Sequence, residues 1–183
     1  AFRIKWFPSH SLSLWSWAIQ NSQDTLSFGG RAELSSSFGE FGFTFHSDPS
    51  KTPQQRLAFD IRHDGFMGTW LETALITSEN SYIKMATIGA DYTLPVLNGI
   101  LIMTESMFIK TSEVEDQSFT AFMGMLPLGM IHSLLFISQF DWKEDRSYHY
   151  LRWSATYDKF SLNLLLSQSQ KRSAYNIPIE YLP

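Results

Sequence analysis

The sequence has no cysteine and little charge. The absence of cysteine excludes disulfide bonds. Charged residues make up 17% of the 183 residues, whereas they make up about a quarter of a typical soluble domain. The formal net charge of −4 gives no electrostatic basis for binding nucleic acid, so no such partner is expected. A chain this poor in charge needs an apolar place for its abundant apolar residues, either a protein core or a lipid bilayer.

The sequence also lacks a signal peptide and a continuous apolar helix. The first ten residues, AFRIKWFPSH, have no basic start, apolar core or small-residue cleavage site. If the protein is exported, we therefore expect this sequence to be a processed or truncated form. Residues 117–140 carry no formal charge and are long enough to cross a bilayer. Pro127 and Gly129 interrupt this stretch, which therefore predicts two strands joined by a Pro127-Leu128-Gly129 turn.

Period-two alternation dominates what is present. In residues 148–166, Leu151 and Trp153 alternate with Arg152 and Ser154, which is typical of strands with two unlike faces. Many of the predicted strands have ten residues or more, whereas soluble strands average about 5–6 and membrane-spanning strands need about 9–11. About twelve strands are predicted, near residues 8–20, 24–36, 40–47, 56–64, 67–78, 81–94, 99–112, 117–126, 130–142, 147–157, 160–169 and 174–182.

Tight turns and longer polar connections alternate along the chain. Asp64-Gly65 and Asn98-Gly99 favour two-residue hairpins, whereas residues 47–56 and 112–117 are polar and longer. Alternate connections of an up-and-down sheet lie at opposite ends, so short turns are expected at one end and polar loops at the other. Outer-membrane barrels show this sorting. The N-terminus is then predicted on the short-turn side.

Charged residues fall on one face of the predicted strands and apolar residues on the other. The charged face is also rich in Ser, Thr, Gly and Asn, which suits a hydrated barrel interior better than a soluble protein surface. The predicted lumen-lining residues are Arg31, Glu33, Asp60, Arg62, Glu72, Asp91, Glu105, Arg152 and Asp158. The predicted lipid-facing residues are Phe59, Ile61, Leu151, Trp153, Leu162, Leu164 and Leu166. Aromatic residues near predicted strand ends, such as Trp15 and Trp17, suggest interfacial girdles.

The aromatic, alternating hairpin at residues 148–166 resembles hairpins near the C-terminal end of bacterial outer-membrane β-barrel proteins of the porin type. The resemblance implies an all-β fold, a membrane-spanning up-and-down antiparallel β-barrel of about 12 strands. Residues 1–183 would form one barrel domain or a segment of a larger barrel. The resemblance also implies a location in a bacterial outer membrane of the Gram-negative type, with membrane lipids as partners, and it is compatible with an oligomer. The implied function is passive passage of small polar solutes, without a cofactor. Members usually end on an aromatic residue, whereas this chain ends in Pro183.

Three alternatives stay open at the level of sequence. A soluble calycin-like barrel would enclose an apolar ligand with its apolar face. An outer-membrane lipid hydrolase would need a Ser–His pair, for which Ser147 and His149 are the best candidates because they share strand parity. A structural subunit of an envelope assembly is the third. No histidine has metal-ligand spacing, so no metal site is expected, and no catalytic residue is assigned.

Overall fold

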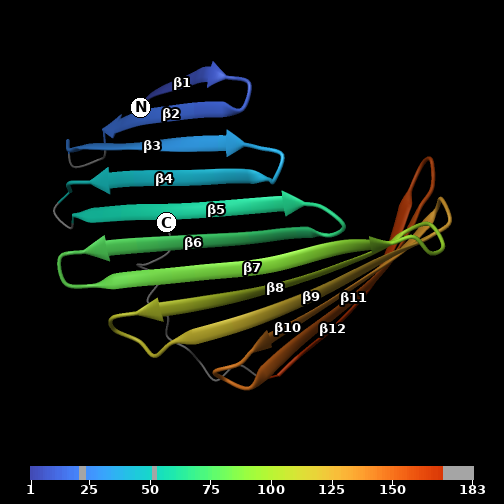
Figure 1. The fold of residues 1–183 in the computed structure, drawn as a ribbon. Helices are drawn as coiled ribbons and strands as arrows, with labels where there is room; N and C mark the ends of the chain where they lie inside the picture. Colours follow the sequence, from blue (N-terminus) through green and yellow to red (C-terminus); the bar gives the residue numbers. More distant parts are fainter. Residues whose placement is uncertain (21–23, 51–52, 171–183) are drawn as a thin grey trace.

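The chain folds into one twelve-stranded antiparallel sheet. The computed structural model describes residues 1–20, 24–50 and 53–170. The strands follow one another in the sheet in chain order, each hydrogen-bonded to the next (Figure 1). Within the described residues no helix is long and apolar enough to cross a membrane. The strands are β1 (Phe2–Ser9), β2 (Leu12–Gln20), β3 (Leu26–Ser35), β4 (Glu40–Asp48), β5 (Gln54–Asp64), β6 (Gly68–Ser78), β7 (Tyr82–Leu94), β8 (Ile100–Thr111), β9 (Gln117–Leu128), β10 (His132–Asp141), β11 (Arg146–Thr156) and β12 (Ser161–Ser169).

This topology confirms the predicted all-β, up-and-down fold with twelve strands, but two strand positions differ. The predicted first strand at 8–20 corresponds to β2 but begins too early, because a turn at residues 10–11 separates β1 from β2. The predicted strand at 174–182 lies outside the described residues. The predicted turn at Pro127 is also wrong, since Pro127 and Leu128 are the last residues of β9 and the turn begins at Gly129.

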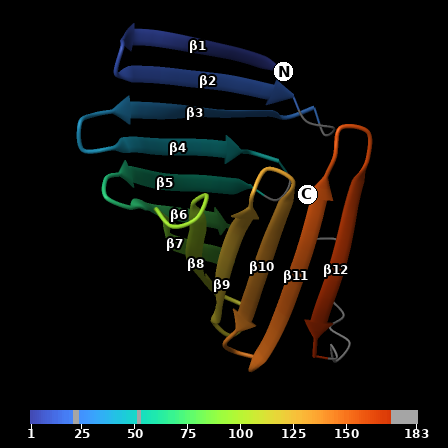
Figure 2. The same ribbon diagram turned by 90° about the vertical axis from the view of Figure 1, so that its right-hand side faces the viewer.

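The sheet is strongly curved and open. In Figure 2, β9–β12 run steeply across the direction of β1–β5, as expected when the right-handed twist between neighbouring strands accumulates over a wide sheet. The described parts of β1 and β12 pair only with β2 and β11, so the sheet has two free edges. The closed barrel is therefore not part of this fold as observed.

The connections at the two ends of the sheet differ more in chemistry than in length. The turn end carries the β1–β2, β3–β4, β5–β6, β7–β8, β9–β10 and β11–β12 connections, which have two to five residues, and the loop end carries the others, which have three to five. The predicted sorting by length is therefore weak, mainly because β4 and β5 extend into the predicted 47–56 loop. The N-terminal prediction is wrong as well, since Phe2 begins β1 at the loop end. Exposed apolar residues such as Phe66, Leu97 and Met130 mark the turn end, and acidic residues mark the loop end: Glu79, Glu113, Glu115, Asp116, Glu144 and Asp145.

Candidate functional site

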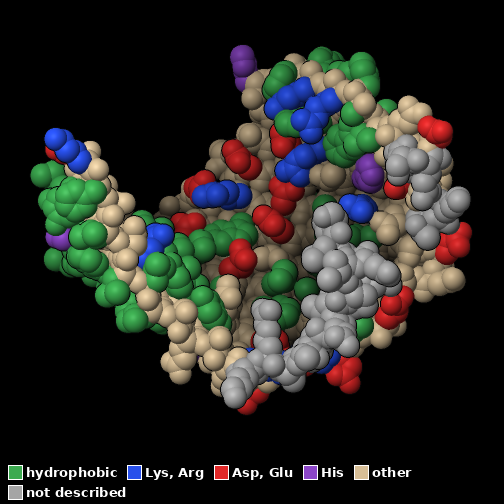
Figure 3. Space-filling model, turned by 180° about the vertical axis from the view of Figure 1, so that it is seen from behind, with side chains coloured by type: hydrophobic (Ala, Val, Ile, Leu, Met, Phe, Trp, Pro, Cys, Tyr) green, Lys and Arg blue, Asp and Glu red, His purple; other side chains and the backbone are tan. Residues whose placement is uncertain are grey.

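The two faces of the curved sheet carry different side chains. Directly paired residues on neighbouring antiparallel strands share a face, so the register places each side chain. Figure 3 shows acidic and basic side chains gathered in the hollow of the molecule. Eight of the nine predicted lumen residues share this concave face: Arg31, Glu33, Asp60, Arg62, Glu72, Asp91, Glu105 and Arg152. The seven predicted lipid-facing residues share the convex face: Phe59, Ile61, Leu151, Trp153, Leu162, Leu164 and Leu166. That these faces meet a lumen and lipid stays a prediction.

Asp158 is the exception among the predicted lumen residues. It lies in the turn at residues 157–160, between β11 and β12, and so belongs to neither face of the sheet. The predicted girdle is incomplete. Trp15 and Trp17 lie in the middle of β2 and share the concave face with Arg31 and Gly29.

Arg31 is the centre of a fixed charge cluster on β3–β5. Its guanidinium donates two parallel hydrogen bonds to Asp60, from Nη1 to Oδ1 at 2.7 Å and from Nη2 to Oδ2 at 2.9 Å. Its Nε donates to Glu33 Oε1 at 2.8 Å, and Nη1 also reaches Thr44 Oγ1 at 2.9 Å. Ser13 donates to the other oxygen of Glu33. Bidentate, charge-assisted pairs of this kind fix orientation as well as adding stability, so Arg31 forms a rigid part of the concave wall.

Three contacts on the concave face pass over a glycine and join strands that are not neighbours. Trp17 of β2 donates from Nε1 to His46 Nδ1 of β4 at 3.0 Å, across Gly29 of β3. A Cβ built on Gly29 would lie 2.6 Å from the Trp17 ring. The glycine therefore leaves the space through which the indole reaches the second strand along.

The same arrangement recurs twice more. The Arg31–Asp60 pair crosses β4 at Gly42, where a Cβ would collide with both side chains. Trp70 of β6 donates from Nε1 to Glu105 Oε2 of β8 at 3.2 Å, and its ring covers Gly89 of β7. We call these three contacts the glycine bridges. They connect β2 to β4, β3 to β5 and β6 to β8.

Carboxylates outnumber cations along the middle of the concave face. Glu72 lies directly opposite Asp60, and Arg62 pairs with Asp64 at 3.1 Å near the turn end. No lysine or arginine of the described chain forms an ion pair with Glu72, Asp91 or Glu105. This row across β6–β8 therefore gives the concave wall an excess of negative charge. The described residues hold no group of three His, Asp or Glu side chains arranged to hold a metal ion.

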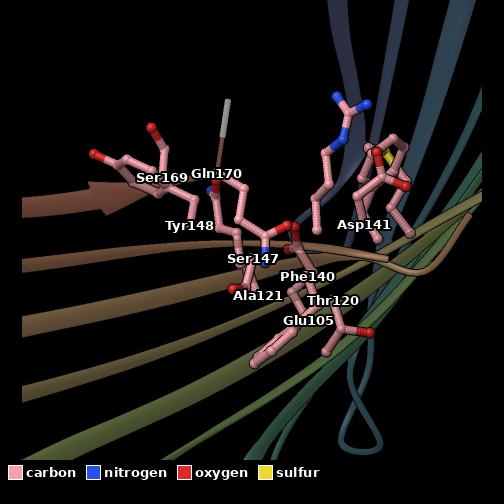
Figure 4. Close-up of a pocket in the computed structure, with 13 residues that line it drawn as sticks. Glu105, Thr120, Ala121, Phe140, Asp141, Ser147, Tyr148, Ser169 and Gln170 are labelled. Atoms are coloured by element: carbon pink, nitrogen blue, oxygen red, sulfur yellow. The ribbon is translucent and has the colours of Figure 1, made fainter. Parts of the chain in front are cut away.

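A pocket of about 790 Å³ lies at the loop end of β8–β12. Most of the lining side chains belong to the concave face, and Figure 4 shows them coming from all five strands. Met107, Phe119 and Tyr148 give the pocket an apolar lining, while Glu105 and Arg146 supply charge. Arg146 pairs with Glu144 at 3.2 Å. This volume is within the range of about 300–1,000 Å³ that small-molecule sites occupy.

The predicted Ser147–His149 pair is not the contact that His149 makes. Both residues share the convex face of β11, but His149 Nδ1 lies 3.0 Å from the hydroxyl of Ser138 on β10. Ser138 is only 5% exposed and His149 stacks on Phe136 at 6.5 Å, so the hydroxyl is covered. The contact satisfies two polar groups within an apolar face, and its covered hydroxyl is poorly placed to act as a nucleophile.

Comparisons with known proteins give no relative. No protein-family model, curated protein or solved structure matches the chain. The case for function therefore depends on the geometry of the sheet and its two faces.

Proposed function

We propose that this protein is a channel of the bacterial outer membrane, a membrane-spanning β-barrel that lets small polar solutes pass through a hydrated interior. Passage is passive and uses no cofactor or catalytic group. The charged half of the concave face, on β3–β8, is the wall along which polar solutes move.

One observation carries the proposal: the convex face is mainly apolar, and nearly all ionised side chains of the strands are on the concave face. Leu162, Leu164 and Leu166 are each more than half exposed on the convex face. Fully burying such a side chain is worth about 1.5–3 kcal/mol, so a convex surface of this composition is costly in water and favourable in lipid. A soluble calycin-like barrel needs the reverse arrangement, with the apolar side chains inside.

Closure of the barrel follows from the same chemistry. A free strand edge in hydrocarbon leaves backbone groups unpaired, at several kcal/mol each, so the β1 and β12 edges must be paired in a membrane. With an even number of strands, β1 and β12 run antiparallel and are able to pair. Ile4 and Trp6 of β1 share the convex face with Leu164 and Leu166 of β12, so pairing would continue the apolar band.

The experiment is fractionation followed by conductance. We expect the protein in the outer-membrane fraction, with heat-modifiable migration in detergent. In planar bilayers, Arg62→Glu on the concave face should shift ion selectivity towards cations, because it replaces a cation of the proposed channel wall. Lys110→Glu is the matched control, because Lys110 lies on the convex face near the loop end.

Two results would contradict the proposal. Recovery of a monomer from the soluble fraction without detergent would contradict the proposed location in the membrane. Unchanged selectivity in Arg62→Glu, with the barrel intact, would remove Arg62 from the wall of the channel.

A further inference from the structure

The concave face is divided into a charged half and an apolar half. The charged half on β3–β8 holds the Arg31 cluster and two of the glycine bridges, Arg31–Asp60 and Trp70–Glu105. On β8 and β9 most concave positions are apolar instead, and β10–β12 add further apolar residues between polar ones: Leu101, Met103, Met107, Ile109, Phe119, Met123, Met125, Leu135, Ile137, Tyr148, Tyr150 and Leu165. A channel wall that meets only water and polar solutes has no need of this composition. The apolar half is suited to contact with an apolar group.

Methionine is concentrated on the concave face, mainly on β8 and β9. Every methionine located within a strand has its side chain on the concave face, and Met103 lies directly opposite Met123. The set is Met85, Met103, Met107, Met123 and Met125. Methionine is unbranched and polarizable, and it is common on surfaces that adapt to flexible apolar ligands. An alkyl chain is such a ligand.

Arg152 is a cation without a partner in the middle of the apolar half. Its directly paired neighbours are Leu135 on β10 and Leu165 on β12. Its Nε is buried and makes no hydrogen bond, and no carboxylate of the described chain pairs with it. Of the other concave-face arginines, Arg31, Arg62 and Arg146 have carboxylate partners, Arg56 donates to Gln54, and Arg3 lies over the ring of Trp15. A buried donor left unpaired costs about 1–3 kcal/mol, which an anionic ligand would recover.

The spacing between Arg152 and the 790 Å³ pocket suits an extended chain. Tyr148, which lines the pocket, precedes Arg152 by four residues on β11 and shares its face. Four residues of strand span about 13 Å, and Ile137 and Tyr150 lie along that path. A carboxylate held at Arg152 would thus allow an alkyl tail of medium length to run along the apolar half into the pocket.

We propose that the apolar half of the concave face binds an aliphatic monocarboxylate, with the carboxylate on Arg152 and the alkyl chain directed towards Tyr148. The guanidinium fork matches a carboxylate bidentately, and the methionine wall accommodates the tail. The proposal deepens the proposed function, since it names a second solute class for the same barrel, and it relies on that function only for the route by which the ligand arrives.

The test is equilibrium binding of labelled decanoate to the full chain in lipid nanodiscs, with empty nanodiscs subtracted. We expect saturable binding, no binding of acetate, which lacks the tail, and weak binding of decanol, which lacks the charge. Arg152→Gln should raise the dissociation constant about tenfold or more, as loss of a charge-assisted pair does. Met123→Gln should also raise the dissociation constant, because it removes an apolar contact with the alkyl chain. Arg62→Gln, which removes a paired arginine of the same face, is the matched control and should leave it unchanged.

Equal affinity in the wild type, Arg152→Gln and Met123→Gln would overturn the proposal, and so would the absence of saturable binding. Heat-modifiable migration of each variant shows that the barrel has folded. Failure here is distinct from failure of the proposed function: a protein that conducts ions but does not bind decanoate overturns only the ligand, and one that binds decanoate but does not conduct overturns only the channel.

Discussion

Single glycines decide how the concave face is built. Gly29, Gly42 and Gly89 each lie beneath a side chain that reaches from one strand to the second strand along. Each bridge ends in a hydrogen bond, so loss of the glycine would displace both a ring or guanidinium and its partner. Glycine is required at these positions because there is no room for a Cβ atom.

Gly89→Ala tests the requirement for space. The added methyl group would overlap the ring of Trp70, so we expect a loss of about 1–3 kcal/mol in unfolding free energy, as overpacking usually costs. Denaturant unfolding of the folded protein measures it, and the fluorescence of Trp70 should shift as its bond to Glu105 is lost. Gly124→Ala is the control, since its Cβ would meet only Phe122 at an ordinary 3.9 Å. Equal stability of the two variants would contradict the role given to Gly89.

Two consecutive leucines of strand β12 lie on opposite faces of the sheet. Leu164 and Leu165 are 58% and 54% exposed, and both are leucines, but they project from opposite sides of the sheet. Leu164 belongs to the convex apolar band, whereas Leu165 is paired with Arg152 on the concave face. They form a matched pair for deciding which side meets lipid.

We expect Leu164→Glu to destabilise the folded protein by about 2 kcal/mol in a bilayer, because a charge on the lipid face of a barrel strand is costly. Leu165→Glu should be neutral or stabilising, because the new carboxylate lies opposite the unpaired guanidinium of Arg152. Reversible urea unfolding in lipid vesicles compares the two. A larger loss of unfolding free energy in Leu165→Glu than in Leu164→Glu would contradict the proposal that the convex face contacts lipid.

The whole sheet has two free edges whose chemistry is complementary. On β1 the concave face carries Arg3 and Lys5, which lie over the ring of Trp15 at 5.0 and 4.0 Å, and the convex face carries apolar residues. Strand β12 has a similar division, with Asn163, Leu165 and Ser167 on the concave face and Leu162, Leu164 and Leu166 on the convex face. Joined edges would continue both faces without a break.

The absence of cysteine allows closure to be tested directly. Ile4→Cys combined in turn with cysteine at Leu162, Leu164 or Leu166 should give one pair that forms a disulfide within a single chain in the membrane-embedded protein. Migration in non-reducing gels measures it. Ile4→Cys with Leu165→Cys is the control, since these side chains project from opposite faces and should not react. Only intermolecular products, or none, would contradict closure of the sheet by its own edges.

Much of this architecture follows from period two. Alternation predicted eleven of the strands near their true positions and placed Phe59 and Asp60, or Trp153 and Arg152, on opposite faces. It missed β1, where Pro8 and a break in register between Trp6 and Ser9 obscure the pattern. It also ended β9 too early, because Pro127 is tolerated next to the last residue of a strand.

The contacts of the candidate site could not be predicted in the same way. Parity shows that Arg31 and Asp60 share a face, but only the register across β3, β4 and β5 shows that they meet above Gly42. The isolation of Arg152 has the same origin, since its leucine neighbours lie on two other strands. Register between strands depends on turn geometry and packing, which the periodicity of one strand does not contain.

The glycine bridges also determine how the sheet would respond to force. In an ordinary meander, a pull on one end removes hairpins one after another, since each strand is held only by its neighbours. Here β2 is tied to β4, and β3 to β5, so the first strands share a load that would otherwise fall on a single seam. Mechanical resistance should therefore be concentrated in β2–β8, while β9–β12, which have no such tie among the described residues, should peel away one by one.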